Sequence, residues 1–167
     1  KKAAEKFNSN AAQYNLAVTY IKMDELKKAK NALESVEKDA DWNNAMGVIA
    51  LREDNLDEAS KYFAAAGNET AKENAAVISI LKGDYQAAAA ALANAKGFNA
   101  ALAQLLVGNN APAAALKCEC AKTAYLRAVA AARNGDAEAV KTNLEAAKKC
   151  EKLAERAAKD VEFAQYR

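Results

Sequence analysis

This 167-residue chain contains no histidine, a single proline and three cysteines, and only 7% of its residues are aromatic. The absence of histidine removes the usual general base at neutral pH and the commonest metal ligand. The sequence also lacks a P-loop, a dinucleotide-binding fingerprint and a nucleophile elbow. These absences predict a protein that is not an enzyme and that carries neither a metal nor a cofactor.

The chain also lacks a long apolar run and a large excess of one charge. Its most apolar stretch, residues 85–107, is interrupted by polar side chains, whereas a membrane span needs about 20 mostly apolar residues. The 24 basic and 22 acidic residues are interspersed, whereas nucleic-acid binders cluster basic charge on one face. Neither a membrane span nor nucleic-acid binding is therefore expected. No signal peptide is visible, and the opening Lys1 and Lys2 are consistent with an excised or mature fragment.

Alanine and other apolar residues dominate what is present, at 52% apolar overall. Alanine is the best helix former and lets helices approach closely, and interior prolines would break helices. The single proline, Pro112, is expected in the first turn of a short helix, where a missing N–H costs nothing. The composition predicts an all-α fold of closely spaced helices.

A short phrase that begins with Asp or Gly recurs between stretches of helical hydrophobic spacing. It occupies residues 24–29, 54–59 and 83–88, and looser copies start at Gly108 and Gly135. Equally spaced turns between amphipathic helices indicate a repeat array of helical hairpins.

The turn residues have physical roles. Gly83 suits the left-handed backbone at a helix C-terminus, and Asp84 and Asp136 are expected to cap the helices that follow. Asp24 and Asp54 occupy the glycine position of the first two turns. The motif Asn68, Glu69, Thr70 has the form of a glycosylation acceptor, but a helix start capped by Asn68 or Thr70 is the preferred interpretation.

We predict one repeat domain over residues 1–167. Its expected units are residues 10–38, 40–67, 69–96, 98–117 and 118–149, followed by a helix over residues 151–165 that covers the open end of the stack.

The three regular units resemble the tetratricopeptide repeat. The matching residues are Leu16, Ala17, Tyr20, Leu26, Ala29 and Leu33, then Met46, Gly47, Leu56, Ala59, Phe63 and Ala66, then Ala76, Gly83, Asp84, Tyr85, Ala88, Leu92 and Ala95. The resemblance implies a right-handed α-solenoid of about five antiparallel hairpins. The spacing is shorter than in that family, and the proline that usually ends each unit is missing. The alanine-rich hairpins also resemble repeat regions of bacterial cell-envelope proteins. This resemblance favours a periplasmic or envelope location over a cytoplasmic one.

In this family the first helix of each hairpin lines a concave groove that binds a partner. The resemblance assigns the groove to Tyr14, Val18, Ile21, Lys22, Asn44, Val48, Leu51, Arg52, Glu73, Val77, Ile80, Tyr125, Val129 and Arg133. This set is mostly apolar, which suits a helix or an extended peptide. The alternative interpretation is that the apolar members are core and that Lys22, Arg52 and Arg133 are ordinary solvated charges.

The cysteines are the remaining candidates for special chemistry. If the fifth turn centres on residues 135 and 136, Cys120 lies almost opposite Cys150 across the antiparallel pair. We therefore predict a disulfide between Cys120 and Cys150, which would imply an oxidising compartment. The alternative is three free thiols that behave as small hydrophobes. Cys118 and Cys120 lack the spacing of a zinc or thioredoxin-like motif.

The sequence thus predicts a non-catalytic interaction module whose apolar groove binds another protein or a further domain of the same polypeptide. The alternative is a structural spacer or oligomerisation domain of a cell-envelope assembly.

Overall fold

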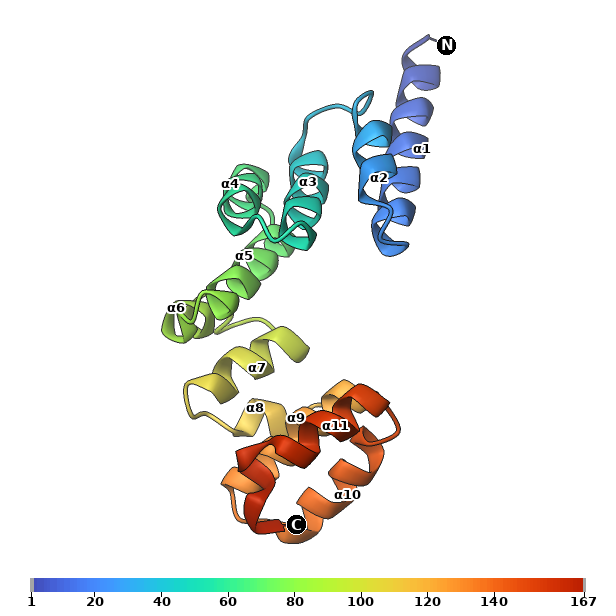
Figure 1. Ribbon diagram of the computed structural model, residues 1–167. Coiled ribbons are helices and arrows are strands. Elements are labelled where there is room, and N and C mark those ends of the chain that lie inside the picture. Colours follow the sequence, from blue (N-terminus) through green and yellow to red (C-terminus); the bar gives the residue numbers. More distant parts are fainter. Residues whose placement is uncertain (1, 167) are drawn as a thin grey trace. The chain divides into compact units, whose positions relative to one another are not determined.

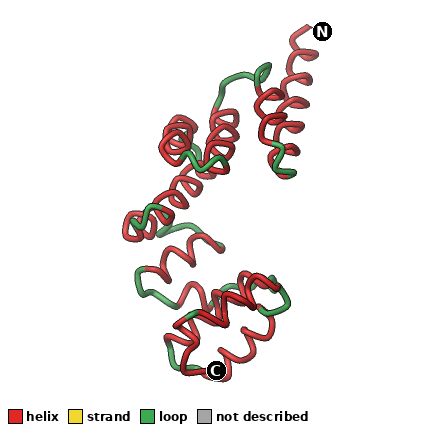
Figure 2. The backbone as a smooth tube through the Cα atoms, in the orientation of Figure 1, coloured by secondary structure: helices red, strands yellow, loops and turns green. Residues whose placement is uncertain are grey.

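The computed structural model describes the backbone of residues 2–166 and the side chains of residues 9–166. Over the described backbone the chain forms eleven α-helices and one 3-10 helix and contains no strand, so the all-α prediction is confirmed (Figures 1 and 2). The chain divides into two compact units, Lys1–Lys82 and Gly83–Arg167. This boundary falls inside the predicted unit 69–96. The single array over residues 1–167 stays a prediction, and its two end residues lie outside the described backbone.

The first unit consists of five helices that pack in chain order. α1 packs against α2, α3 against α4, and α3 also contacts α1, α2 and α5. Their bounds are α1 (Lys2–Lys22), α2 (Leu26–Leu33), α3 (Ala40–Arg52), α4 (Leu56–Ala66) and α5 (Glu69–Leu81).

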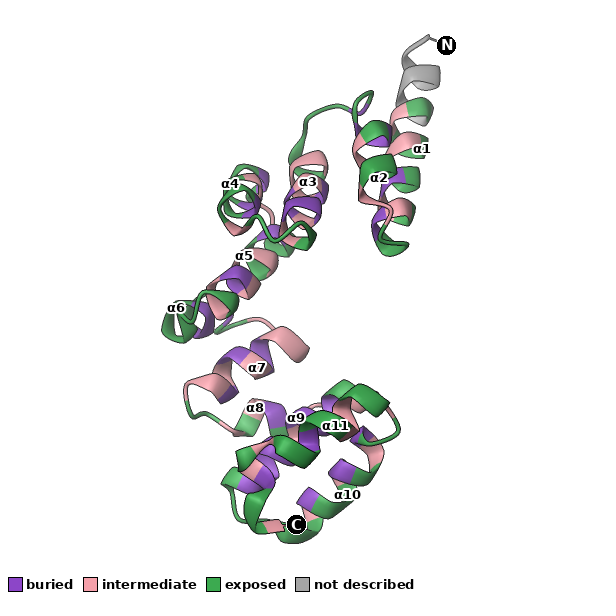
Figure 3. Ribbon diagram, viewed as in Figure 1, coloured by how far each residue is buried: buried purple, intermediate pink, exposed green. Residues whose placement is uncertain are grey.

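Two small clusters of buried apolar side chains hold this unit together. The cluster at α1, α2 and α3 includes Ala17, Leu33 and Ile49, and the cluster at α3, α4 and α5 is centred on Phe63. Because many of the buried residues are alanines, the helices come close without bulky side chains between them. Along the described side chains of this unit, buried residues are interspersed with exposed ones on each helix (Figure 3), as the hydrophobic spacing predicts.

α3 and α4 make a close contact at Gly47. A Cβ built on Gly47 would lie 2.5 Å from a ring carbon of Phe63. Phe63 is only 2% exposed, so its ring has little room to move away. Gly47 therefore lets the Phe63 ring lie directly on the backbone of α3.

The turns follow the chemistry expected from the repeated phrase. Asp24 and Asp54 have positive φ angles of 63° and 61°, in the conformation that Gly83 and Gly135 adopt at the equivalent turns. Asn68 begins α5 by accepting a hydrogen bond from the N–H of Ala71, which confirms the helix-start interpretation. Asp84 and Asp136 cap the next helices in the same way, as predicted.

The second unit contains the remaining helices. Their bounds are α6 (Tyr85–Ala91), α7 (Phe98–Leu106), α8 (Ala111–Ala114), α9 (Ala121–Arg133), α10 (Ala137–Ala147), α11 (Glu151–Lys159) and the 3-10 helix η1 (Val161–Tyr166). Pro112 lies in the first turn of the short α8, as predicted. α9 contacts α7, α8, α10, α11 and η1, and nine of its 13 residues are buried, so it forms the centre of this unit.

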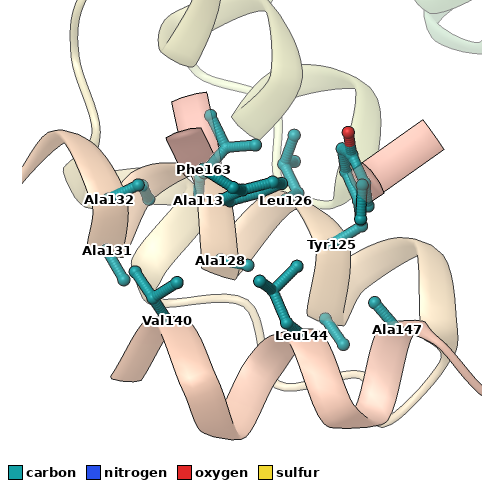
Figure 4. Packing of buried hydrophobic residues seen from close by; sticks show 14 of the residues in the cluster. Ala113, Tyr125, Leu126, Ala128, Ala131, Ala132, Val140, Leu144, Ala147 and Phe163 are labelled. Atoms are coloured by element: carbon teal, nitrogen blue, oxygen red, sulfur yellow. The ribbon is translucent and has the colours of Figure 1, made fainter. Parts of the chain in front are cut away.

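The core of the second unit surrounds α9 on two sides. Figure 4 shows Val140, Leu144 and Ala147 of α10 on one side of α9. On the other side lies Phe163, toward which α9 directs its own Tyr125. The expected single covering helix over residues 151–165 is two segments, because α11 ends at Lys159 and Asp160 is extended with ψ at 124°. Asp160 then caps the next segment by accepting a hydrogen bond from the N–H of Glu162.

Candidate interaction surfaces

Eleven of the predicted groove residues lie in the first unit, on α1, α3 and α5. We call these residues the unit 1 stripe: they are Tyr14, Val18, Ile21, Lys22, Asn44, Val48, Leu51, Arg52, Glu73, Val77 and Ile80. Only Ile21 is buried, while Lys22, Arg52 and Glu73 are exposed and the others are half-buried. Val48 and Leu51 pack against the core with part of their surface. The apolar members are therefore partly core and partly accessible.

Polar contacts tie neighbouring first helices together within the stripe. Arg52, the last residue of α3, donates a hydrogen bond of 2.5 Å from Nη1 to the carbonyl oxygen of Ile21 near the end of α1. The same nitrogen lies 3.1 Å from Asp24 Oδ1. Between α3 and α5, Asn74 Nδ2 donates to Asn44 Oδ1 at 3.0 Å. Arg52 and Asn44 thus have structural roles, which the sequence alone did not indicate.

The N-terminal part of the stripe has an acidic neighbourhood. Tyr14 lines a cavity of about 200 Å³ together with Asp39 and Asp41. Partial burial raises the pKa of Tyr14, and the carboxylates of Asp41 and Asp39 raise it further. Lys22 and Arg52, at the other end of α1 and α3, supply positive charge. The charge of Arg52 is paired with Asp24, so Lys22 carries the positive charge at that end and Asp39 and Asp41 the negative charge at the other.

The three predicted groove residues of the second unit, Tyr125, Val129 and Arg133, form what we call the α9 stripe. Tyr125 and Val129 are each only 7% exposed. The segment over residues 160–166, which we call the tail segment, lies against this helix, and its Phe163 belongs to the same core cluster as Tyr125 and Val129. The structure thus places these three residues on one face of α9 and shows the face occupied.

The contacts between the tail segment and the α9 stripe combine an aromatic ring with carboxylates. The ring of Phe163, 1% exposed, meets the ring of Tyr125 edge to face, with centroids 5.6 Å apart. The Tyr125 hydroxyl donates to Asp160 Oδ2. Burial, and then this hydrogen bond, raise the pKa of Tyr125 to about 12. The hydroxyl therefore stays protonated as the donor to Asp160 at neutral pH.

Arg133 joins the tail segment to the preceding helices. Its Nη2 lies 2.6 Å from Glu162 Oε1, and Nε of the same guanidinium lies 2.9 Å from that oxygen. Its Nη1 donates to the carbonyl oxygen of Leu105, near the end of α7, at 2.6 Å. This last bond resembles the one that Arg52 makes to α1. In both cases an arginine at the end of the first helix of one pair binds the first helix of the preceding pair, α3 to α1 and α9 to α7.

Sequence reasoning expected residues 151–165 to cover the end of the stack but did not predict that they would occupy the α9 stripe. Tyr166, whose hydroxyl donates to the carbonyl oxygen of Ala132, and Glu162 were not among the candidate residues. One signal was present: Asp160, Glu162 and Phe163 place two acids and a ring within four residues of each other. That set complements a helix bearing a tyrosine and an arginine.

In the structure, Cys118, Cys120 and Cys150 are all free thiols. Cys120 and Cys150 occupy the N-cap positions of α9 and α11. The closest side-chain partners of Cys120 are instead Thr123, at 3.2 Å, and Cys118. The predicted disulfide between Cys120 and Cys150 is therefore absent from the structure.

No protein-family model matches this chain, and no curated protein matches it. None of the helices in the described part of the chain is both long enough and apolar enough to cross a membrane. Within the same residues, no three Cys, Asp or Glu side chains gather where a metal ion could be held.

Proposed function

We propose that this chain is a non-catalytic interaction module that binds a helical or extended segment of a partner protein along the exposed faces of its first helices. We propose, further, that its helix pairs form a right-handed solenoid of the tetratricopeptide type. The observation that supports binding best is the tail segment, which lies on the α9 stripe as a peptide ligand would. The repeated arginine bonds, from Arg52 to Ile21 and from Arg133 to Leu105, support a regular stacking of first helices within each unit.

The tail segment indicates the chemistry of a suitable ligand. Its aromatic ring packs on Tyr125, and the carboxylate of Glu162 pairs with Arg133. The ion pair is partly shielded, because the two side chains are 31% and 28% exposed, so it is less screened than a fully exposed pair. We propose that the partner segment likewise carries an aromatic residue beside an acidic one.

α1 repeats the α9 stripe in residue type and in spacing. Tyr14, Val18 and Lys22 stand at intervals of four residues, as do Tyr125, Val129 and Arg133. This spacing places each set along one face of its helix. Val18, Val77 and Ile80 are half-buried and belong to neither core cluster of the first unit, within the side chains described. An incoming ring can therefore bury apolar surface there.

The charge along the unit 1 stripe orients the ligand. Asp39 and Asp41 lie beside Tyr14, so a carboxylate is disfavoured at that end. Lys22 favours a carboxylate at the other end, where Arg52 is already paired with Asp24. The bound segment would therefore place its ring toward Tyr14 and Val18 and its acid toward Lys22.

A labelled peptide with the sequence of residues 160–166 tests this proposal against the whole chain by fluorescence anisotropy. We expect saturable binding, and we expect Val48→Asp together with Val77→Asp to weaken it at least about tenfold, because burying a new carboxylate at a contact costs more than about 1.4 kcal/mol. Ser60→Asp, on the exposed side of α4, is the matched control and should leave binding unchanged. Circular dichroism checks that each variant keeps its helices.

Two further peptides examine the proposed ligand chemistry. Replacing the phenylalanine by alanine, or the glutamate by glutamine, should each weaken binding. Equal binding by the wild-type chain and the Val48→Asp, Val77→Asp variant would refute the groove. That result would instead favour the alternative, a structural spacer or oligomerisation domain, which would use other surfaces.

A further inference from the structure

Two cysteines lie together in the loop that joins α8 to α9. Cys118 and Cys120 are separated by one residue, and both are exposed. Both line the same cavity of the second unit. Cys150 is only partly exposed and does not line this cavity. The pair is therefore distinct from the third cysteine.

Cys120 is placed to act as a nucleophile. It is the N-cap residue of the 13-residue helix α9, where the partial positive charge of the helix end favours a thiolate. Its Sγ–H donates to Oγ1 of the buried Thr123 at 3.2 Å, and after ionisation the Thr123 hydroxyl can turn to donate to the thiolate. The neighbouring Cys118 side chain, and then Thr123, lower the pKa of Cys120 to about 7. A large share of Cys120 is therefore ionised at neutral pH.

The cavity beside the pair is lined by apolar and basic residues. Its volume is about 720 Å³, within the usual size of small-molecule sites. Phe98, Pro112 and Leu116 supply apolar surface, and three lysines, Lys96, Lys117 and Lys122, lie among its lining residues. None of the described residues that line it is acidic. Such a cavity favours a small molecule that carries carboxylates.

We propose that Cys118 and Cys120 form a thiol–disulfide exchange site for small disulfides that bear carboxylates, such as glutathione disulfide. The cavity binds the disulfide, the lysines attract its carboxylates, Cys120 attacks and Cys118 resolves. This inference does not depend on the proposed peptide-binding function, which uses other residues.

The exchange proceeds in two balanced steps. The Cys120 thiolate attacks one sulfur of the small disulfide, whose S–S bond breaks and releases one small thiolate, leaving a mixed disulfide on Cys120. The Cys118 thiol then loses its proton and attacks Sγ of Cys120, and the second small thiolate leaves. The protein dithiol is oxidised to a disulfide, and the small disulfide is reduced to two thiols that take up the two protons.

The test treats the reduced whole chain with glutathione disulfide and follows intact and peptide masses over time. We expect the wild-type chain to lose two hydrogens from the peptide that contains both cysteines, without a lasting glutathione adduct. Cys118→Ser should stop at one adduct on Cys120. Cys120→Ser should react about five- to tenfold more slowly at pH 7, since it removes the thiol that lies at the N-terminus of α9 beside Thr123.

Two controls separate this site from general thiol reactivity. Cys150→Ser should behave as the wild type does. Replacing Lys117 and Lys122 by glutamine should slow the reaction with glutathione disulfide about two- to fivefold, and leave that with the uncharged bis(hydroxyethyl) disulfide unchanged. A stable adduct on the wild-type chain, modification of Cys150 first, or an unchanged rate in Cys120→Ser would overturn the proposal.

Discussion

Asp24 and Asp54 show how single residues set the turns of this chain. Each adopts a left-handed backbone conformation, with φ at 63° and 61°, which costs a residue with a Cβ more than it costs glycine. They differ in one respect: the carboxylate of Asp24 lies 3.1 Å from Arg52, whereas the structure gives Asp54 no ion pair among the described side chains. Comparing substitutions of Asp24 and Asp54 therefore separates the cost of the left-handed backbone from the attraction between Asp24 and Arg52.

We predict that Asp54→Gly raises the free energy of unfolding by about 0.5–1 kcal/mol. Relief of the left-handed conformation exceeds the added flexibility of the unfolded chain. Asp24→Gly should give a smaller gain, because it also removes the ion pair with Arg52. Urea denaturation followed by circular dichroism measures both, and a loss of stability in Asp54→Gly would contradict the assigned strain.

At this scale the sequence was informative wherever the interaction is local. Asp84 and Asp136 each accept a hydrogen bond from the N–H of the residue three positions ahead. Their capping roles could therefore be predicted from the neighbouring sequence. Arg52 binds a carbonyl 31 residues earlier in the chain. That role could not be predicted, because nothing near Arg52 in the sequence identifies Ile21 as its acceptor.

At the scale of the element, α3 and α4 depend on a glycine that has an ordinary helical conformation. Gly47 matters because the Phe63 ring lies on it. We predict that Gly47→Ala lowers the free energy of unfolding by about 1–3 kcal/mol, since the added methyl overpacks a buried contact and outweighs the better helix propensity of alanine. Urea denaturation measures the loss.

A second variant shows whether this contact is the cause. Adding Phe63→Leu to Gly47→Ala should cost less than the sum of the two single changes, because leucine leaves room for the methyl group. Strict additivity would mean that the two residues do not meet.

The final helical segments show where element prediction fails. Residues 151–165 were expected to form one helix, but the chain is extended at Asp160. There the Asp160 carboxylate binds the Tyr125 hydroxyl, 35 residues away, and the N–H of Glu162. Side chains of aspartate that bond to nearby backbone compete with the helix. The break thus depends on a tertiary contact that local helix propensity does not encode.

At the scale of the whole molecule, each unit has its own buried clusters. Phe63 belongs to a cluster built from α3, α4 and α5, whereas Phe163 belongs to one built around α9. The boundary near Gly83 could not be predicted, because the repeated phrase there is as regular as at the other turns. The repeated phrase determines the local geometry of a turn. It does not determine how extensively the helices before and after that turn pack on each other.

We predict that Phe163→Ala accelerates amide hydrogen exchange in α9 and in the tail segment but leaves α3 and α4 unchanged. Removing the ring should lower the stability of the second unit by about 3 kcal/mol, because the ring is almost fully buried. Val161→Ala is the matched control: Val161 is 84% exposed, so its truncation should change stability by less than about 0.5 kcal/mol. Equal acceleration in both units would contradict separate cores.

The bonds from Arg52 to Ile21 and from Arg133 to Leu105 have a consequence for how such a chain can diverge. In both, the acceptor is a main-chain carbonyl, which every amino acid possesses. Replacing the side chain of Ile21 or Leu105 leaves the acceptor in place, so the bond itself constrains only the arginine, while burial in the core still requires an apolar side chain at both acceptor positions. Apolar residues of different shape can therefore replace Ile21 or Leu105 while the bond between the two helices is kept. A repeat built this way can preserve its geometry long after the similarity between its copies has faded.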